Sequence, residues 1–300
     1  MILSNYNYFM KSFEIFFSNS IKKEPVAVVN PNNEVSLLGA MEAESKGLIK
    51  PLLIGNTNEI KLLSEKLNLS LNHCELIEAL NEEEILKTTV ELAQNGKVKA
   101  IMKGNIDTGS LLKAIVKKEN NLRGSSVISH LFAISVPSYH KLFFLTDAAI
   151  NIEPNADQKK AILENAIKAV QKLGIKNPKI AMLSATEKAN SKMKSSIEAL
   201  EIANEFKNSF IIEGPLAFDV IINKKAAEIK KINSQVAGDV DLIISPNIET
   251  ANTLFKALTY LANAKTAGVV LGAKVPIILT SRSDNQESRL LSCAFSNLLV

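Results

Sequence analysis

The segment PVAVV at residues 25–29, followed by EVSLLGAMEAESK at residues 34–46 and PLLIG at residues 51–55, decides the fold class. The first and third stretches are short apolar runs next to turn residues, which is typical of buried strands. The middle stretch has helical spacing and ends at Gly47, a common helix stop. A strand, a helix and a strand in succession predict a βαβ unit in a largely parallel sheet.

This alternation continues along the chain, with one interruption. We expect helices at 58–66 and 82–95 and strands at 73–77 and 100–102, and the same rhythm again from 157 to 299. Between them, strand-like runs at 127–136 and 142–145 flank PSYHK, which predicts a hairpin and a crossover between domains. The sequence thus predicts two α/β domains, with residues 1–126 and 276–300 in domain I and residues 127–275 in domain II.

Composition excludes several classes of protein. With 46% hydrophobic and 22% charged residues, the 300-residue chain is an ordinary globular one. The net charge of +4 is spread over mixed-sign clusters rather than a basic stripe, so nucleic acid is not expected as a partner. Two distant cysteines, Cys74 and Cys293, predict a reducing compartment, the cytoplasm, and no zinc. Residues 1–20 lack a basic n-region, so we expect neither a targeting segment nor a membrane role.

Arginine is rare in this chain and therefore informative. Only Arg123, Arg282 and Arg289 occur among 35 basic residues. Arg282 follows Ser281 just after the apolar run 275–279. Arginine grips planar or tetrahedral oxyanions with a rigid fork that lysine lacks. The pair Ser281 and Arg282 thus predicts a phosphate or carboxylate site.

Other candidate anion donors also follow predicted strands. Neither GxGxxG nor GxxxxGK[ST] occurs among the 12 glycines, so phosphate donors must be side chains and helix N-termini. Lys103 with Thr108, the expected cap of the next helix, forms one cluster. A second comprises Arg123, Ser125, Ser126 and Ser129. Each cluster alone also fits a surface lysine, an edge strand or a cap, but ligands of open α/β sheets bind where these clusters gather.

Two further patterns are weak. Ser129 and His130 invite a nucleophile-and-base interpretation, yet no GxSxG elbow accompanies them and neighbours on a strand face opposite ways. Asp239 and Asp241 lack a third metal ligand at a convincing spacing. We therefore expect no metal site. Asn252 lies at a strand-to-helix junction, where a capping and a functional role are both open.

Whole segments resemble the phosphate acetyltransferase and phosphate butyryltransferase family. The matching segments run in order from about residue 25 to the C-terminus and comprise Met102–Thr108, Ile128–His130, Leu145–Ile152, Glu213–Asp219, Val236–Asp239, Ser245–Asn252 and Thr280–Arg282. Two positions depart from the family pattern, because Asn247 replaces the usual aspartate and Ala251 the usual glycine. The length and the Ser129–His130 pair resemble the butyryl-type branch.

The resemblance implies two α/β domains like those of isocitrate and isopropylmalate dehydrogenases, with the active site in the cleft between them and a homodimer formed through domain II. It also implies reversible transfer of a short acyl group between coenzyme A and inorganic phosphate in a ternary complex. Coenzyme A or acyl-CoA is then a substrate, and the partners are small molecules. No metal and no tightly bound cofactor are expected.

The resemblance also assigns roles to residues. Ser281 and Arg282 match the family's reactive pair, and an acid after them, Asp284 or Glu287, is expected as the base for the thiol. The predicted substrate-binding residues are Lys103, Thr108, Arg123, Ser126, Ser129, His130 and Asn252. Two alternatives stay open, namely a metal- and NAD(P)-dependent decarboxylating dehydrogenase of the same fold and an inactive coenzyme A-binding scaffold.

Overall fold

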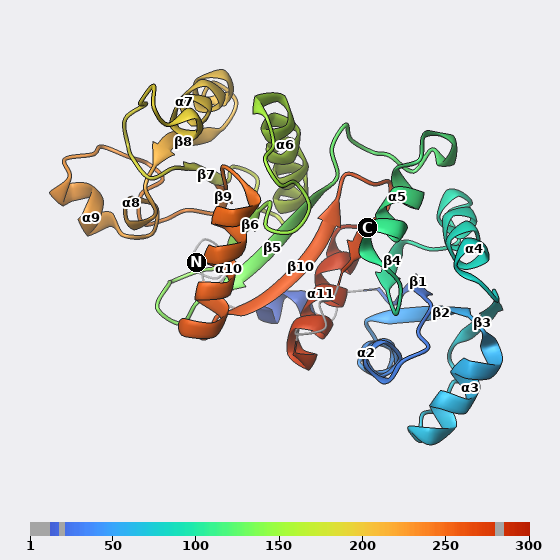
Figure 1. Ribbon diagram of the computed structural model, residues 1–300. Helices are drawn as coiled ribbons and strands as arrows, with labels where there is room; N and C mark the ends of the chain where they lie inside the picture. The colour runs from blue at the N-terminus through green and yellow to red at the C-terminus, as the bar shows by residue number, and fades with distance from the viewer. Residues whose placement is uncertain (1–12, 18–21, 280–284) are drawn as a thin grey trace. The chain divides into compact units, whose positions relative to one another are not determined.

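The computed structural model describes residues 13–17, 22–279 and 285–300, which fall into two compact α/β units. One, called here the terminal unit, comprises residues 16–128 and 267–300. The other, the central unit, comprises residues 129–266 with the described residues before Phe16. Figure 1 labels most of the elements of both.

The terminal unit is a mainly parallel sheet with strand order β3-β2-β1-β4-β11-β10. Strands β1, β2, β3 and β4 run parallel, β11 is parallel to β4, and β10 is antiparallel to β11. Its elements are η1 (Phe13–Phe17) and β10 (Lys265–Leu271), whose first residues belong to the central unit, and β1 (Glu24–Val29), α2 (Glu34–Ser45), β2 (Ile49–Gly55), α3 (Thr57–Lys66), β3 (Glu75–Glu78), α4 (Glu82–Gln94), β4 (Ala100–Lys103), α5 (Thr108–Val116), η2 (Lys118–Asn120), β11 (Ile277–Ile278) and α11 (Gln286–Leu298).

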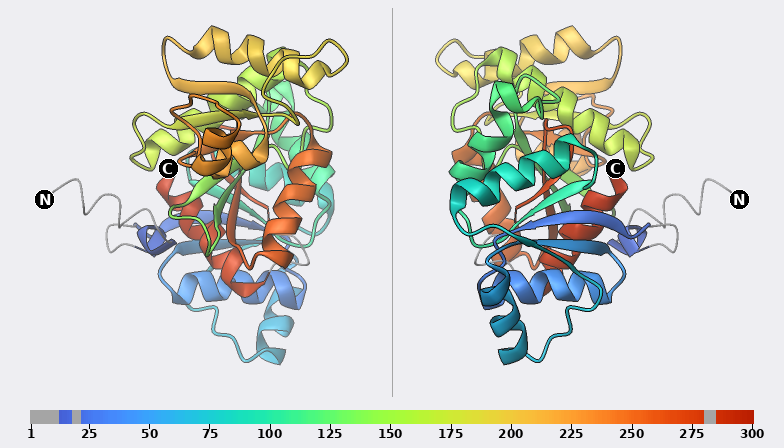
Figure 2. Two further views of the ribbon diagram at one scale, coloured as in Figure 1. Left: turned by 90° about the vertical axis from the view of Figure 1, so that its left-hand side faces the viewer. Right: turned by 90° about the vertical axis from the view of Figure 1, so that its right-hand side faces the viewer.

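Helices cover both faces of this sheet because its strands are apolar on both sides. Residues 26–29 of β1 and 51–55 of β2 are all buried, as expected for parallel strands between helix layers. Helices α2 and α11 pack against each other, and so do α4 and α5. Figure 2 shows α2 and α4 on opposite faces of β1 and β2.

The strand order creates a crevice. From β1 the chain proceeds through β2 to β3 at one edge and then returns to place β4 on the other side of β1. The loops after β1 and β4 therefore leave the sheet as neighbours and diverge to opposite faces. Such a topological switch point, at the carboxyl ends of the strands, is where open α/β sheets bind ligands.

The central unit has strand order β5-β6-β9-β7-β8. Strands β5 and β6 form an antiparallel hairpin, and β6, β9, β7 and β8 run parallel. Its elements are β5 (Ser129–Ser135), β6 (Phe143–Thr146), α6 (Ala156–Lys172), β7 (Lys179–Leu183), α7 (Lys194–Phe206), β8 (Ile211–Leu216), α8 (Phe218–Ile222), α9 (Lys224–Ile229), β9 (Leu242–Ile244) and α10 (Ile248–Leu261).

One face of the central sheet packs on α6 and α7. The other forms a hydrophobic core with the helices α8, α9 and α10, centred on Phe143, Leu145 and Ile243. Glu213 and Gly214 lie in β8 beside β7, where the register shifts. A Cβ on Gly214 would overlap Met182, so this position requires glycine.

The βαβ rhythm and the hairpin predicted from the sequence are confirmed, with most ends within two residues. Helices α8 and α9 were missed because each is too short for a helical period to stand out. Cys293 is buried, whereas Cys74 is only half-buried beside the sulfur of Met41. Near the start of the chain, Phe16 stacks on Phe295 with ring centroids 5.2 Å apart.

Candidate active site

The loop after β4 is held tightly against the loop after β1. The backbone N–H groups of Gly104 and Asn105 donate to the carbonyl oxygens of Val29 and Asn30 at 2.9 Å. A Cβ on Gly104 would overlap the carbonyl oxygen of Val29, so only glycine permits this approach. The Lys-Gly-Asn sequence thus places Lys103 at the switch point.

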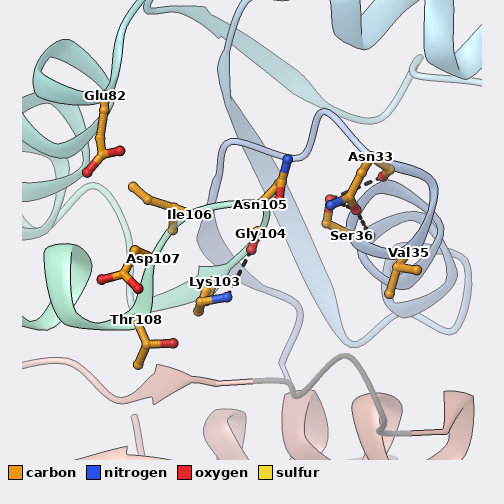
Figure 3. Close-up of a pocket in the computed structure, with 10 residues that line it drawn as sticks. All are labelled: Asn33, Val35, Ser36, Glu82, Lys103, Gly104, Asn105, Ile106, Asp107 and Thr108. Carbon is orange, nitrogen blue, oxygen red and sulfur yellow. Dashed lines mark hydrogen bonds between the residues drawn. The ribbon is translucent and has the colours of Figure 1, made fainter.

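A pocket of about 610 Å³ opens at this point (Figure 3). It is lined by Asn33, Val35, Ser36, Glu82 and residues 103–108. Lys103 is half-buried, and its ammonium donates to the carbonyl of Gly104 at 3.3 Å. Thr108 is exposed on the same wall. The structure therefore brings the predicted pair Lys103 and Thr108 together in one pocket.

The expected cap at Thr108 is wrong by one residue. Asp107 is the N-cap of α5, because its carboxylate accepts from the backbone N–H of Ser110 at 2.8 Å, and Thr108 is the first helical residue. The carboxylate bonds that N–H group more strongly than a hydroxyl would. The Thr108 hydroxyl is thereby left to the pocket rather than to the helix end.

Arg123 and Ser126 lie on a second loop of the terminal unit. Both side chains are exposed, and the Arg123 guanidinium donates to the carbonyl of Ser126 at 3.4 Å. Backbone bonds from Gly124 and Ser125 to Gly272 join this loop to the turn between β10 and β11. The arginine is therefore held by its backbone while its charge stays in solvent.

Ser129 and His130 open strand β5 and are both buried. The Ser129 hydroxyl accepts from the amide of Asn165 on α6 at 3.2 Å, whereas the His130 ring lies against Phe132, with centroids 4.1 Å apart. Consecutive residues of a strand face opposite sides, so they do not form a nucleophile–base pair. Burial lowers the pKa of His130 to about 3, which keeps its imidazole neutral.

Asn252 supports a loop of the central unit. Its amide on α10 donates to the carbonyl of Ala148 at 3.0 Å. That loop is built around the buried Asp147, whose carboxylate accepts from the backbone N–H groups of residues 149–151 and from the Asn151 amide, at 2.6–3.2 Å. Burial raises the pKa of Asp147, and these bonds oppose the increase. The polar residues of the matched segment 145–152 therefore hold the backbone of their own loop in place.

The predicted catalytic residues Ser281, Arg282 and Asp284 lie outside the described residues. The strand that precedes them is described. Ile278 of β11 pairs with Met102 of β4 in parallel register, so β11 ends beside Lys103. The carboxyl ends of parallel strands lie on the same side of a sheet, and β11 therefore ends on the side where the pocket opens.

Acids in the other matched segments have internal partners. Glu213 accepts from the backbone of Gln235 at 2.8 Å, and Asp219 pairs with Lys230 at 2.9 Å. Asp239 accepts from Lys179, Lys141 and His140 at 2.6–3.0 Å. Burial acts to raise the pKa of Asp239, but these three bonds outweigh it and hold it well below its ordinary value. These acids connect loops.

Sequence reasoning missed several pocket residues, namely Asn33, Ser36, Glu82 and Asn105. Asn33 caps α2 and therefore carried a signal, since asparagine before a helical pattern marks a helix start.

Within the described ranges, no three His, Cys, Asp or Glu side chains cluster as metal ligands would. Of the helices described, none has the length and apolar character needed to cross a membrane.

Comparison with known proteins gives consistent matches. The family model for "Phosphate acetyl/butaryl transferase" matches residues 81–295. A phosphate acetyltransferase from Rickettsia typhi is 40% identical over 94% of this chain and 82% of its own length, and a phosphate butyryltransferase from Clostridium acetobutylicum is 33% identical over 94% and 95%. A branched-chain phosphotransacylase from Enterococcus faecalis superposes with a TM-score of 0.82 at 32% identity, over 92% of this chain and 99% of that one.

Proposed function

The chain belongs to the phosphate acetyl/butyryl transferase family and is an acyltransferase; on that premise we propose that the pocket holding Lys103 and Thr108 receives the phosphoryl group in a reversible reaction between acyl-CoA and inorganic phosphate. The observation that carries this assignment is the position of Lys103, a half-buried ammonium in the switch-point pocket beside the end of β11. The Thr108 hydroxyl adds a neutral donor on the same wall. A lysine and a hydroxyl near helix N-termini suit a phosphoryl group.

The reaction requires positioning of two anionic substrates and stabilisation of an oxyanion. A phosphate oxygen attacks the thioester carbonyl, the new carbon–oxygen bond forms, and the carbon–sulfur bond breaks to release the thiolate. The proton lost by phosphate passes to a base and then to the departing sulfur. In this proposal Ser281 and Arg282 stabilise the negative charge that develops on the carbonyl oxygen, and Asp284 or Glu287 is the base.

The remaining predicted contacts are assigned by their surroundings. Arg123 and Ser126, both exposed, are available to a substrate phosphate. Substrate contact by Ser129, His130 and Asn252 stays a prediction. The burial of Ser129 and His130 and the hydrogen bonds of Ser129 and Asn252 support a role in positioning strand β5 and the loop after β6. The base is expected among the acids after Arg282 because the family resemblance places it there.

Several broader features belong to the same proposal. The family resemblance supports two domains of the isocitrate dehydrogenase kind, limits near residues 126 and 275, a cleft between the domains as the active site, and a cytoplasmic homodimer. Coenzyme A enters as a substrate rather than as a tightly bound cofactor. The dehydrogenase alternative is not favoured, since the matched family and relatives are acyltransferases.

The test is phosphate-dependent release of free thiol from acetyl-CoA, propionyl-CoA and butyryl-CoA. We expect release from at least one of them, and the series identifies the preferred acyl chain. Release from none would disprove the proposed function.

Arg282→Ala is expected to lose about 100-fold in kcat, the effect of removing one preorganised oxyanion donor. Arg289→Ala is the arginine control for this measurement. Near-normal turnover of Arg282→Ala would restrict Arg282 to a structural role.

A further inference from the structure

A second, smaller pocket of about 170 Å³ lies beside the larger one in the terminal unit. Its walls come from the loops after β1, β2, β3 and β4, and it shares Glu82 and Ile106 with the larger pocket. The two pockets are therefore neighbours. The lining residues are Asn30, Asn32, Asn56, Glu59, residues 79–82, Ile85 and Ile106.

The small pocket has an apolar floor and a polar rim. Ala79, Ile85 and Ile106 are at most 9% exposed and form the apolar part, while Leu80 is 65% exposed beside them. At about 30 Å³ per water molecule, the volume equals roughly five or six waters. Such a space accepts one flat ring system and excludes a whole coenzyme.

The rim holds a relay of oriented amides. The Asn105 amide donates to Asn32 at 2.8 Å, and the amides of Asn32 and Asn56 donate to the two carboxylate oxygens of Glu59 at 3.3 Å. Asn30 donates to the carbonyl of Asn105 at 2.9 Å. These bonds hold the amides of the rim in fixed orientations, so the rim is preorganised.

Asn81 and Glu82 are consecutive residues of the pocket lining and carry a donor and an acceptor. The Asn81 carbonyl oxygen caps α4 by accepting from Glu84 at 3.0 Å, which leaves its NH₂ group as a donor. Glu82 follows in the first turn and presents a carboxylate acceptor. Adenine displays the complementary edge, an amino donor next to a ring-nitrogen acceptor, which asparagine side chains commonly read.

The charges of the pocket exclude a phosphate group. Its lining contains the carboxylates of Glu59 and Glu82 and neither lysine nor arginine. A phosphate there would face like charges without compensation. The lysine of this region, Lys103, lines the larger pocket instead.

From this arrangement we propose that the small pocket binds the adenine ring of acyl-CoA. The ring lies on Ile85 and Ile106 under Leu80, and its edge meets Asn81 and Glu82. The neighbouring larger pocket then takes the part of the substrate that leads towards Lys103 and the end of β11. This inference rests on the proposed acyl-CoA activity and adds the part of the substrate that the terminal unit recognises.

The kinetic test uses two variants, each with a matched control on an exposed residue outside both pockets. Leu80→Ala is compared with Leu62→Ala, since these leucines are 65% and 66% exposed. Glu82→Ala is compared with Glu83→Ala in the same helical turn. Losing the apolar cover is expected to raise the KM for acetyl-CoA about fivefold, and losing the charged acceptor about tenfold. Butyryl-CoA replaces acetyl-CoA if wild type prefers it.

A truncated substrate locates the effect on the coenzyme. S-acetyl-4′-phosphopantetheine lacks the adenosine part, so its KM and the KM for phosphate are expected to stay within twofold of wild type in Leu80→Ala and in both controls. An unchanged KM for acetyl-CoA in Leu80→Ala and Glu82→Ala would overturn the proposal. An equal increase for the truncated thioester in Leu80→Ala would overturn it too, because the contact would then lie elsewhere on the substrate.

Calorimetry with adenosine 3′,5′-bisphosphate separates this inference from the proposed function. Wild type and both controls are expected to bind it, and Leu80→Ala and Glu82→Ala are expected to bind it at least fivefold more weakly. Absence of binding to wild type, or equal binding by Glu82→Ala, would refute the pocket assignment even if acyl transfer is observed. An enzyme without acyl transfer would refute the function alone.

Discussion

The carboxyl ends of the strands are used differently in the two units. In the terminal unit, Lys103 and Thr108 line an open pocket of about 610 Å³. In the central unit, Asp147, directly after β6, accepts hydrogen bonds from its own loop. Polar side chains of the terminal unit therefore line an open pocket, whereas Asp147 of the central unit is hydrogen-bonded to its own loop. Similar motif residues thus predict activity effects in the first unit and stability effects in the second.

Asp147→Ala gives the largest expected effect. The change leaves four N–H groups around a buried site without their acceptor, so the free energy of unfolding should fall by about 3 kcal/mol. Urea unfolding measures it. Asp157→Ala, on a side chain 92% exposed, is the control and should change stability by less than about 0.5 kcal/mol. A loss below about 1 kcal/mol in Asp147→Ala would contradict the structural role.

Lys103→Ala tests the other side of the comparison. Removing a charged donor to phosphate costs about 2 kcal/mol, or roughly 30-fold in kcat/KM for phosphate, while stability changes little. Lys99→Ala just before the opposite end of β4 is the control. Steady-state kinetics at varied phosphate measures the effect. A variant that loses stability but keeps its phosphate dependence would reverse the assignment of the two units.

The pH dependence of stability tests whether burial of His130 makes the central unit less stable at low pH. Unfolded His130 takes up a proton below its ordinary pKa of 6.5, whereas burial holds the folded pKa at about 3. Protons therefore favour the unfolded chain, and stability should fall by about 2 kcal/mol from pH 7 to pH 5. Urea unfolding of His130→Phe should show a correspondingly flatter profile. His73→Gln, on an exposed histidine, is the control. An unchanged profile in His130→Phe would assign the pH dependence to other groups.

The smallest effects separate Asp107 from Thr108. Asp107→Ala removes the cap of α5 and should cost about 1 kcal/mol of stability. Thr108→Val removes a neutral donor from the pocket and should lower kcat/KM for phosphate about fivefold without that cost in stability. Urea unfolding and steady-state kinetics of both variants measure these effects. A loss of stability in Thr108→Val, with none in Asp107→Ala, would identify Thr108 as the cap.

Prediction from sequence succeeded where local pattern suffices. Residues 25–55 gave strand, helix and strand because period and turn residues are local signals. Lys103 was found because it ends a buried strand, and the amide relay around Asn32 and Glu59 was not, since those residues meet only across separate loops. Thr108 was misplaced as a cap because Asp107 competes for the same backbone N–H group.

The sequence by itself determined the α/β class, the order of most elements and the family, because periodicity and motif order are written along the chain. Tertiary structure alone decided which polar residues remain available. Strand order places β4 beside β1 and opens the pocket at Lys103. Packing buries His130 and surrounds Asp147 with donors. Hydrogen bonds and burial depend on distances in space, and neighbours in sequence do not reveal them.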